Sequence, residues 1–428
     1  MNEPALAPVD PSTLARRFEA VRAATLALIA PLEPEDMQVQ SMADVSPTKW
    51  HLGHTTWFFE TFVLEPRPEH RPFHPRFREI FNSYYQQVGD RHPRPDRGLL
   101  TRPRLREVLE YREHVESQLA GILHRDPESL GERALSLVEL GLHHEQQHQE
   151  LMLMDIKHVL GSNPLDPRYR PERAPDPSTP APLHWHRVDG GLVEIGHDGR
   201  GFGYDNEFPR HRAWVEDVEI ASRPVTNREL LEFVEDGGYL EPTLWLADAW
   251  DHMQNHDPWS APMYWERRDG RWMQFTLHGL EPLRLDEPAT HLSYYEADAF
   301  ARWTGYRLPT EDEWENIAHD LPVEGNFADD GRWHPRAYTG DSADSENRPV
   351  QMFGDVWEWT QSHYSPYPGF RAPAGAVGEY NGKFMANQFV LRGGCWATPK
   401  DHVRATYRNF FHPWTRWHFG GVRLVRDV

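Results

Sequence analysis

Apolar residues recur with helical spacing through the first 160 residues of this 428-residue chain. The spacing predicts four amphipathic helices, because apolar positions three or four residues apart share one helix face. Ser12 is expected to cap the first helix, and Ser46-Pro47 to start the second in the usual cap-then-proline order. The predicted helices cover about 13–30, 46–62, 104–123 and 132–160.

Four amphipathic helices with one long connection are typical of a helix bundle, whose core can hold a metal between facing helices. The connection, residues 65–102, is long enough to carry function and contains an Asn-Ser-Tyr-Tyr string at 82–85. We therefore expect a metal-binding four-helix bundle over residues 1–161.

The pattern changes in the rest of the chain. Seven prolines fall between residues 162 and 183, a density that is typical of a semi-rigid linker. From 184 to 428, short β-like runs such as 192–195 alternate with Gly and Pro breaks. This alternation predicts an irregular α+β domain that follows the linker.

Two histidines lie four residues apart near the middle of the last predicted helix. His144 and His148 share one helix face and could bind the same metal ion. Packed core or surface histidines are the alternative interpretation of such a pair. The string Trp-His-Leu-Gly-His at 50–54 favours the metal, because His51 or His54 could supply the third ligand that the pair needs.

The composition narrows the function classes. The chain has 45 Lys+Arg and 66 Asp+Glu, a net charge of −21, which disfavours nucleic acid and anionic membranes as partners. No stretch reaches the roughly 18 apolar residues of a membrane span, and the N-terminus lacks a signal-peptide pattern. The single cysteine, Cys395, excludes an intramolecular disulfide and favours a cytoplasmic location.

Three strings in the C-terminal half resemble those of the formylglycine-generating-enzyme fold, an irregular, C-type-lectin-like domain. They are residues 306–315, 354–359 and 391–396, and Gly-Gly-Val-Arg-Leu follows them at 420–424. The activity of that enzyme needs a pair of active-site cysteines, whereas this chain has one cysteine in total. The resemblance therefore implies the fold over residues 184–428 without the activity.

The N-terminal half resembles the damage-inducible type of helix bundle, which carries a His-x-x-x-His-x-Glu motif, here ending at Glu150. A bundle followed by this C-terminal domain resembles the ergothioneine-biosynthesis sulfoxide synthases (the EgtB-like family) over essentially the whole chain. That resemblance implies a non-haem iron(II) centre held by His54, His144 and His148, with His51 in reserve for the first ligand.

The activity that this resemblance implies is an O2-dependent oxidation with O2 as co-substrate. The enzyme would join a thiol donor, cysteine or γ-glutamylcysteine, to C2 of the hercynine imidazole as a sulfoxide. Neutral imidazoles suit iron(II), although a zinc site could use the same three ligands. Hercynine carries a quaternary ammonium group, which aromatic faces bind well, and the chain has 17 Trp.

The same resemblance implies roles for residues around the iron. Tyr84 and Tyr85 are the expected catalytic residues, since a phenol can deliver a proton or an electron during the oxidation. Gln147 and Asn409 are expected to contact hercynine, and Gln147 also lies beside the predicted metal face of its helix. The donor carboxylate needs a cation, for which Arg91 and Arg416 are chosen from the arginines near the motifs, namely Arg91, Arg94, Arg97, Arg404 and Arg416.

Two departures leave the donor open. Cysteine-using relatives usually read Phe-Met-Cys-Asn-Gln and Arg-Gly-Gly-Ser-Cys-Ala-Thr-Pro, whereas this chain has Ala386 in the first string and Cys395-Trp396 in the second. A selenoneine synthase, which forms a C–Se bond between a selenosugar and hercynine, is therefore the alternative enzyme. Two further hypotheses are a non-catalytic ligand-binding protein and a zinc- or nickel-dependent thiol transferase.

Overall fold

The computed structural model describes residues 11–171, 173, 182–338, 345 and 347–428, without the side chains of residues 11 and 12. The predicted Ser12 cap and much of the predicted proline-rich linker therefore lie outside the described part. The chain divides into two compact units. Unit 1 holds the residues up to Tyr169 with 199–202 and 372–381, and unit 2 holds 170–198, 203–371 and 382–428. The predicted boundaries 1–161, 162–183 and 184–428 stay a prediction.

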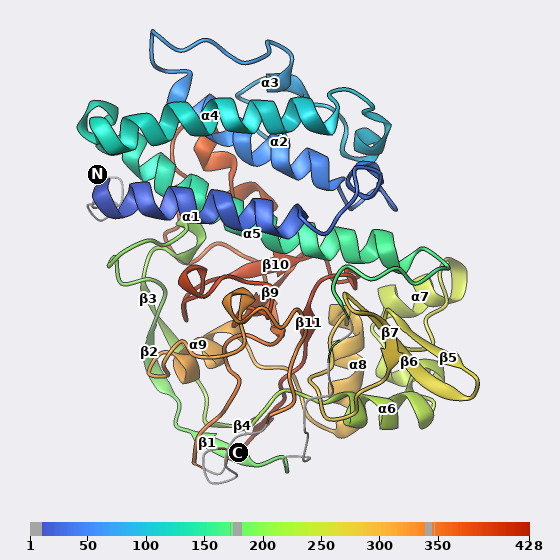
Figure 1. The fold of residues 1–428 in the computed structure, drawn as a ribbon. Coiled ribbons are helices and arrows are strands. Elements are labelled where there is room, and N and C mark those ends of the chain that lie inside the picture. Colours follow the sequence, from blue (N-terminus) through green and yellow to red (C-terminus); the bar gives the residue numbers. More distant parts are fainter. Residues whose placement is uncertain (1–10, 172, 174–181, 339–344, 346) are drawn as a thin grey trace. The chain divides into compact units, whose positions relative to one another are not determined.

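Unit 1 is mainly helical (Figure 1). Helices α1 and α2 each pack against both α4 and α5, while a π-helical segment, η2, continues α2. The bounds of these elements are α1 Pro11–Ile29, α2 Thr48–Phe59, η2 Glu60–Leu64, α3 Phe77–Ile80, α4 Leu105–Arg125 and α5 Gly131–Gly161.

The second helix starts two residues later than the sequence predicts. Thr48 is its first residue, and Pro47 precedes it without a side-chain cap. The backbone N–H of Ser46 donates instead to Asp155 at 2.8 Å, and its hydroxyl accepts from Arg97 at 2.9 Å. Ser46 therefore joins the start of α2 to α5 and to the long connection.

A buried ionic network fixes α5 against its neighbours. Glu145 accepts hydrogen bonds from Arg22 on α1 at 2.9 Å and from Arg112 on α4 at 2.7 Å. Burial alone would raise the pKa of Glu145, but Arg112 and Arg22 lower that pKa to about 2. Because Glu145 follows His144 directly, the network holds the middle turns of α5, where the histidine pair lies.

Unit 2 combines short helices with small sheets (Figure 1). The strand orders in the described residues are β1-β4-β12, β10-β9-β8-β11, β2-β3 and β5-β6-β7, and β11 pairs parallel to β8. The α-helices in the described residues of unit 2 are α6 Asn227–Glu235, α7 Ala247–Asn255, α8 Tyr294–Thr304 and α9 Glu311–Ala318. Its strands are β1 Trp185–Val188, β2 Gly191–Ile195, β3 His211–Val215, β4 Val218–Ala221, β5 Trp265–Arg268, β6 Arg271–Thr276, β7 Gly279–Pro282, β8 Trp357–His363, β9 Phe389–Arg392, β10 Asn409–Phe411, β11 Gly420–Gly421 and β12 Val425–Asp427.

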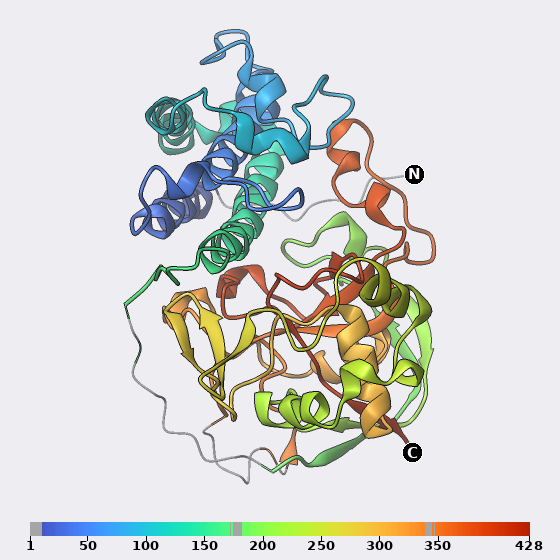
Figure 2. The same ribbon diagram turned by 90° about the vertical axis from the view of Figure 1, so that its right-hand side faces the viewer.

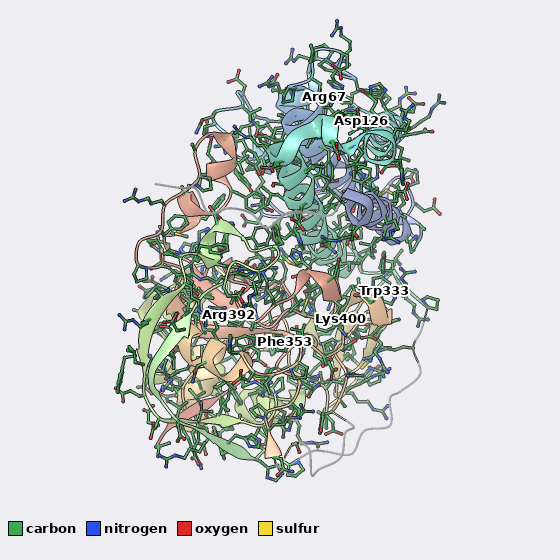
Figure 3. All side chains as sticks on the ribbon, turned by 90° about the vertical axis from the view of Figure 1, so that its left-hand side faces the viewer. Arg67, Asp126, Trp333, Phe353, Arg392 and Lys400 are labelled. Atoms are coloured by element: carbon green, nitrogen blue, oxygen red, sulfur yellow. The ribbon has the colours of Figure 1, made fainter. Side chains whose placement is uncertain are left out.

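Arginines of the motifs in unit 2 form ion pairs that hold its fold together. Arg392, labelled in Figure 3, is fully buried and pairs with Glu311 and Glu315 at 3.0 Å each. The guanidinium of Arg307 binds both carboxylate oxygens of Glu313 at 2.8 Å, which ties the motif at 306–315 together. None of the helices in the described part of the chain has the length and apolar character needed to cross a bilayer.

Candidate functional site

Three histidines of unit 1 meet in its core. His54 comes from α2, and His144 and His148 come from successive turns of α5. One ring nitrogen from each lies within 4.8 Å of the others, and the Nε2 atoms of His54 and His144 are 3.1 Å apart. Among the residues that the structure describes, this is the cluster that could hold a metal ion.

The three imidazoles are held in the neutral form that a metal ligand requires. Burial lowers the pKa of His144 to about 3. Burial, and then the neighbouring histidine His144, lower the pKa values of His54 and His148 well below their ordinary value. Neutral imidazole has one nitrogen with a free lone pair, so each ring can bind a cation without first losing a proton.

His54 is oriented by its own helix and by the chain segment that follows α3. Its Nδ1–H donates to the backbone carbonyl of Phe81 at 2.6 Å, which leaves the lone pair on Nε2. The ring stacks between Trp50, at 4.6 Å between centroids, and Trp57, at 5.4 Å. Support of this kind is typical around metal-binding histidines, where it fixes both the tautomer and the ring plane.

The spacing of the nitrogens suits a metal. Two ligands at right angles with bonds of about 2.1 Å lie about 3 Å apart, and the two Nε2 atoms of His54 and His144 are at 3.1 Å. Nδ1 of His144 is buried without a hydrogen-bond partner in the described part of the chain. Three neutral imidazoles suit iron, zinc, nickel or copper, so the donor set fits iron(II) without selecting it.

The predicted tyrosine pair lies in unit 1, beside Trp57, whose ring stacks on that of His54. The rings of Tyr84 and Tyr85 stack at 4.6 Å, and the Tyr85 ring lies 5.5 Å from that of Trp57. Burial, and then the nearby phenols of Tyr84 and Tyr380, raise the pKa of Tyr85 well above its ordinary value. The phenol of Tyr85 is therefore protonated at neutral pH.

A third tyrosine was missed by the sequence analysis. Tyr380 lies in the segment 372–381 of unit 1, just after η9 (Ala376–Glu379), drawn in orange-red in Figure 2. Its hydroxyl donates to Oε1 of Gln147, and its ring lies 5.7 Å from that of His144. Because 233 positions separate Gln147 from Tyr380 in the chain, no local pattern could have indicated this contact.

The segment 372–381 is also fixed to the tyrosine loop. The carboxylate of Glu379 accepts hydrogen bonds from the backbone N–H groups of Gln86 and Gln87, at 2.9 Å each. These contacts join the segment that carries Tyr380 to the loop that carries Tyr84 and Tyr85. Tyr380, whose ring lies 5.7 Å from that of His144, is therefore tied to the loop of the tyrosine pair.

The arginines of the long connection differ in burial. Arg91 is exposed and donates to the carbonyl of Ser83 at 3.3 Å. Arg97, which the sequence analysis named but did not choose, is buried with its guanidinium 3.3 Å from the ring centre of Trp50. No carboxylate lies within ion-pair distance of Arg97 in the described part. Burial, and then Arg94, lower the pKa of Arg97 well below its ordinary value, and the more distant carboxylate of Asp155 offsets this only in part.

Two other predicted site residues belong to unit 2. Oδ1 of Asn409, at the start of β10, accepts from the backbone N–H of Phe410 at 2.9 Å. Arg416 pairs with Glu296 at 2.7 Å and lies over the ring of Trp259. Arg416 already pairs with the carboxylate of Glu296. Arg416 is therefore a weaker candidate for binding the carboxylate of a substrate. The substrate roles of both residues stay predictions.

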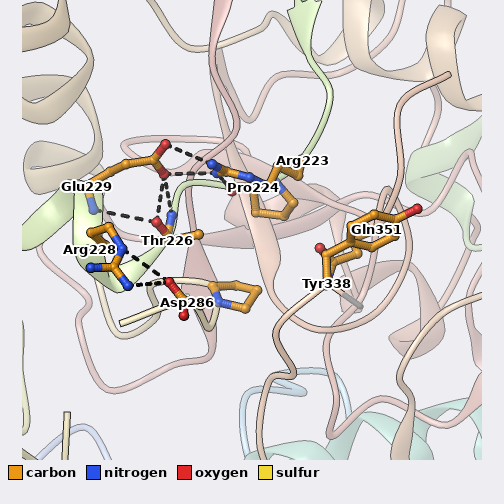
Figure 4. Close-up of a pocket in the computed structure, with 9 residues that line it drawn as sticks. Arg223, Pro224, Thr226, Arg228, Glu229, Asp286, Tyr338 and Gln351 are labelled. Atoms are coloured by element: carbon orange, nitrogen blue, oxygen red, sulfur yellow. Dashed lines mark hydrogen bonds and ion pairs between the residues drawn. The ribbon is translucent and has the colours of Figure 1, made fainter. Parts of the chain in front are cut away.

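Unit 2 also has a small cavity, of about 50 Å³, whose lining is shown in Figure 4. Its arginines are paired with carboxylates, Arg223 with Glu229 at 2.9 Å and Arg228 with Asp286 at 2.6 Å. Typical ligand pockets enclose about 300–1,000 Å³. The cavity is therefore too small and too well neutralised to be the substrate site.

Comparisons with known proteins match the N-terminal and C-terminal halves of the chain to two different families, as its motifs indicated. A family model described as "Sulfatase-modifying factor enzyme 1-like domain" matches residues 171–428, and one described as "DinB superfamily" matches residues 17–152. An "Ergothioneine biosynthesis protein 1" of Schizosaccharomyces pombe is 29% identical over 53% of this chain and 28% of its own length.

Two bacterial relatives match over almost their whole length. A "Hercynine oxygenase" of Mycolicibacterium smegmatis is 31% identical and covers 97% of this chain and 99% of its own. Another, of Mycobacterium tuberculosis, is 31% identical over 98% of this chain and 100% of its own. These matches confirm the resemblance that the motifs indicated. The chain belongs to the hercynine oxygenase (EgtB-like) family, with an N-terminal DinB-superfamily domain and a C-terminal sulfatase-modifying factor enzyme 1-like domain.

Proposed function

We propose that this protein is a non-haem iron(II), O2-dependent enzyme of ergothioneine biosynthesis that joins a thiol to C2 of hercynine and oxidises the sulfur to a sulfoxide. The observation that carries the proposal is the buried cluster of His54, His144 and His148 in a chain whose full-length relatives are named hercynine oxygenases. Cysteine and γ-glutamylcysteine are the proposed donors. The four-helix arrangement of unit 1, the C-type-lectin-like character of unit 2 and a cytoplasmic location belong to the same proposal.

The proposed reaction balances with one molecule of O2. The C2–H bond of the imidazole and the S–H bond of the thiol are broken, and a C–S bond is formed. One oxygen atom enters the sulfoxide and the other leaves as water, so O2 takes up four electrons. Iron(II), when bound by the three histidines, would supply the chemistry that activates O2 and binds the thiol sulfur.

The chain's own residues would orient the substrates and move protons. The phenol of Tyr84 or Tyr85 is the proposed proton or electron donor, and Tyr380 is a further candidate because its ring lies 5.7 Å from His144. Gln147 is the proposed polar contact for hercynine, since it is half-buried beside the histidines on α5. Arg97 is a better-placed cation for the donor carboxylate than Arg91, because it is buried over Trp50.

The products formed in competition test the proposed function. Anaerobically iron-loaded protein would receive hercynine, O2, cysteine, γ-glutamylcysteine and a selenosugar together, with the adducts measured by mass spectrometry. We expect one dominant sulfoxide adduct at C2 of hercynine. Cysteamine should react poorly, because it lacks the carboxylate that a buried arginine would bind.

A different outcome of this competition would indicate a different function. A selenium adduct formed in preference to every thiol adduct would identify a selenoneine synthase and overturn the thiol assignment. The structure gives that enzyme no specific support, because Trp396 is buried against Phe419, at 4.4 Å between rings, and Ala386 is exposed. Binding of hercynine with no adduct under any condition would indicate a ligand-binding protein. Equal turnover of histidine and hercynine would contradict hercynine as the substrate.

Replacing Gln147 by Ala should weaken hercynine binding by about ten- to a hundred-fold, because a hydrogen bond to a charged ligand contributes about 1.5–3 kcal/mol. Calorimetric titration of hercynine without O2 would measure this change. Gln118→Ala is the matched control, since Gln118 lies on α4 and contacts His70 and His114. Unchanged hercynine affinity in Gln147→Ala would remove this residue from the proposed substrate site.

A further inference from the structure

A chain of buried side chains leads from a carboxylate to one of the candidate metal ligands. Oδ2 of Asp155 lies 2.9 Å from Nε2 of His51, and Nδ1 of His51 lies 2.8 Å from Nδ1 of His148. Asp155 and His51 are 3% and 2% exposed. His51 is therefore linked to the metal cluster through His148, although it is outside the cluster itself.

The direction of these hydrogen bonds follows from what each atom can donate. A carboxylate oxygen accepts, so Nε2 of His51 carries the proton that is donated to Asp155. With Nε2 of His51 protonated and donating to Asp155, the lone pair of its ring lies on Nδ1, 2.8 Å from Nδ1 of His148. Nδ1 of His51 must then accept from Nδ1–H of His148. The lone pair of His148 is thereby confined to Nε2.

Asp155 is held in place to accept from His51. Its Oδ2 also accepts from the backbone N–H of Ser46 at 2.8 Å, at the start of α2. The carboxylate therefore joins α5 to α2 on the side of His51. His54 receives comparable support from a single backbone carbonyl, that of Phe81, whereas His148 receives it through two side chains.

We infer that Asp155 and His51 are positioning residues that fix the tautomer and ring orientation of His148 and so raise the affinity of the three-histidine site for iron(II). The inference rests on the proposed function, because it concerns the same metal site. Partners that hydrogen-bond to a ligand histidine typically change metal affinity by about 10- to 100-fold. His51 thus has a role distinct from that of a metal ligand.

Metal titration of the metal-free protein, with both units present, tests the inference. We expect His51→Leu and Asp155→Ala each to weaken anaerobic binding of iron(II) and cobalt(II) by about 10- to 100-fold while one metal ion still binds. The visible absorption bands of bound cobalt(II) should shift in both variants. Asp155→Asn should keep most of the affinity, because its amide oxygen can accept both hydrogen bonds that Oδ2 accepts.

The double variant separates positioning from general stability. If Asp155 acts through His51, His51→Leu/Asp155→Ala should lose no more affinity than His51→Leu alone. His70→Leu is the matched control, because His70 is buried beside Glu60 at 3.3 Å in the same unit and lies outside the metal cluster. Thermal unfolding of the metal-free variants would measure any loss of folding. If His51→Leu does not fold, the comparison of Asp155→Ala with Asp155→Asn carries the test.

Three results would overturn the inference. His51→Leu could bind both metals as tightly as the unaltered protein, or the losses in the double variant could be additive. His51→Leu could instead lose all metal binding, as His148→Ala should, which would make His51 a ligand. If the unaltered protein binds neither metal, the proposed function itself fails, and that outcome is distinct from the three above.

Discussion

Replacing His144 by Ala should abolish tight iron(II) binding and lower product formation by more than the roughly 100-fold that loss of a supporting residue costs. The reason is that His144 would be one of only three protein ligands, and its Nε2 lies 3.1 Å from that of His54. Elemental analysis and anaerobic iron titration would measure the bound metal. The adjacent His143→Ala is the matched control, because His143 is buried on the same helix and stacks on Phe202 at 3.8 Å.

The same loss is expected for His54→Ala and His148→Ala, with unit 2 still folded. Full iron content in His54→Ala together with loss of iron in His51→Ala would show that the first ligand is assigned wrongly. Stoichiometric zinc in protein purified without added metal, with activity that survives iron chelation, would contradict the redox chemistry. That result would favour the zinc-dependent transferase instead.

The histidine pair of the site could be predicted from the sequence because its two members have helical spacing. His144 and His148 are four residues apart on an apolar stripe, and α5 does bring their rings to 4.6 Å between centroids. Helix α5 could be predicted because its apolar residues recur every three or four positions, a pattern that is visible in a single sequence. Family membership was equally accessible, since several motifs occur in the order typical of the relatives.

Spacing alone could not choose between His51 and His54. The two are three residues apart and therefore lie on neighbouring parts of one helix face. The structure directs Nε2 of His54 towards His144, whereas His51 contacts the opposite ring nitrogen of His148 and Asp155. The choice depends on the packing of α2 against α5, which no local pattern encodes.

Contacts between distant parts of the chain account for what the sequence analysis missed. Tyr380 and the segment around it cluster with the helices of unit 1, although they follow most of unit 2 in the chain. Arg91, Arg94 and Arg97 occur at regular spacing in one string, yet only Arg97 of the three is buried. Burial of this kind depends on tertiary packing over Trp50 and so cannot be derived from composition or periodicity.

The double variant Tyr84→Phe/Tyr85→Phe should bind iron(II) normally but form about 10²- to 10⁴-fold less coupled product, as expected when a proton donor is lost. Phenylalanine keeps the ring that packs against Trp57 and Phe62 and removes only the hydroxyl. We expect O2 consumption to continue with oxidation of the thiol alone. Product analysis and O2 uptake, measured on the same samples, would separate lost coupling from lost turnover.

Tyr380→Phe, measured in the same way, decides which phenol serves the reaction. Burial and the neighbouring phenols raise the pKa of Tyr85, which keeps its phenol protonated at neutral pH. The hydroxyl of Tyr380 is already donated to Gln147, so its loss should mainly weaken hercynine binding. Tyr111→Phe is the control, because this buried phenol of unit 1 donates to Glu60. Loss of coupling in Tyr380→Phe, with normal products from the Tyr84/Tyr85 double variant, would transfer the catalytic role to Tyr380 and leave the pair a packing role.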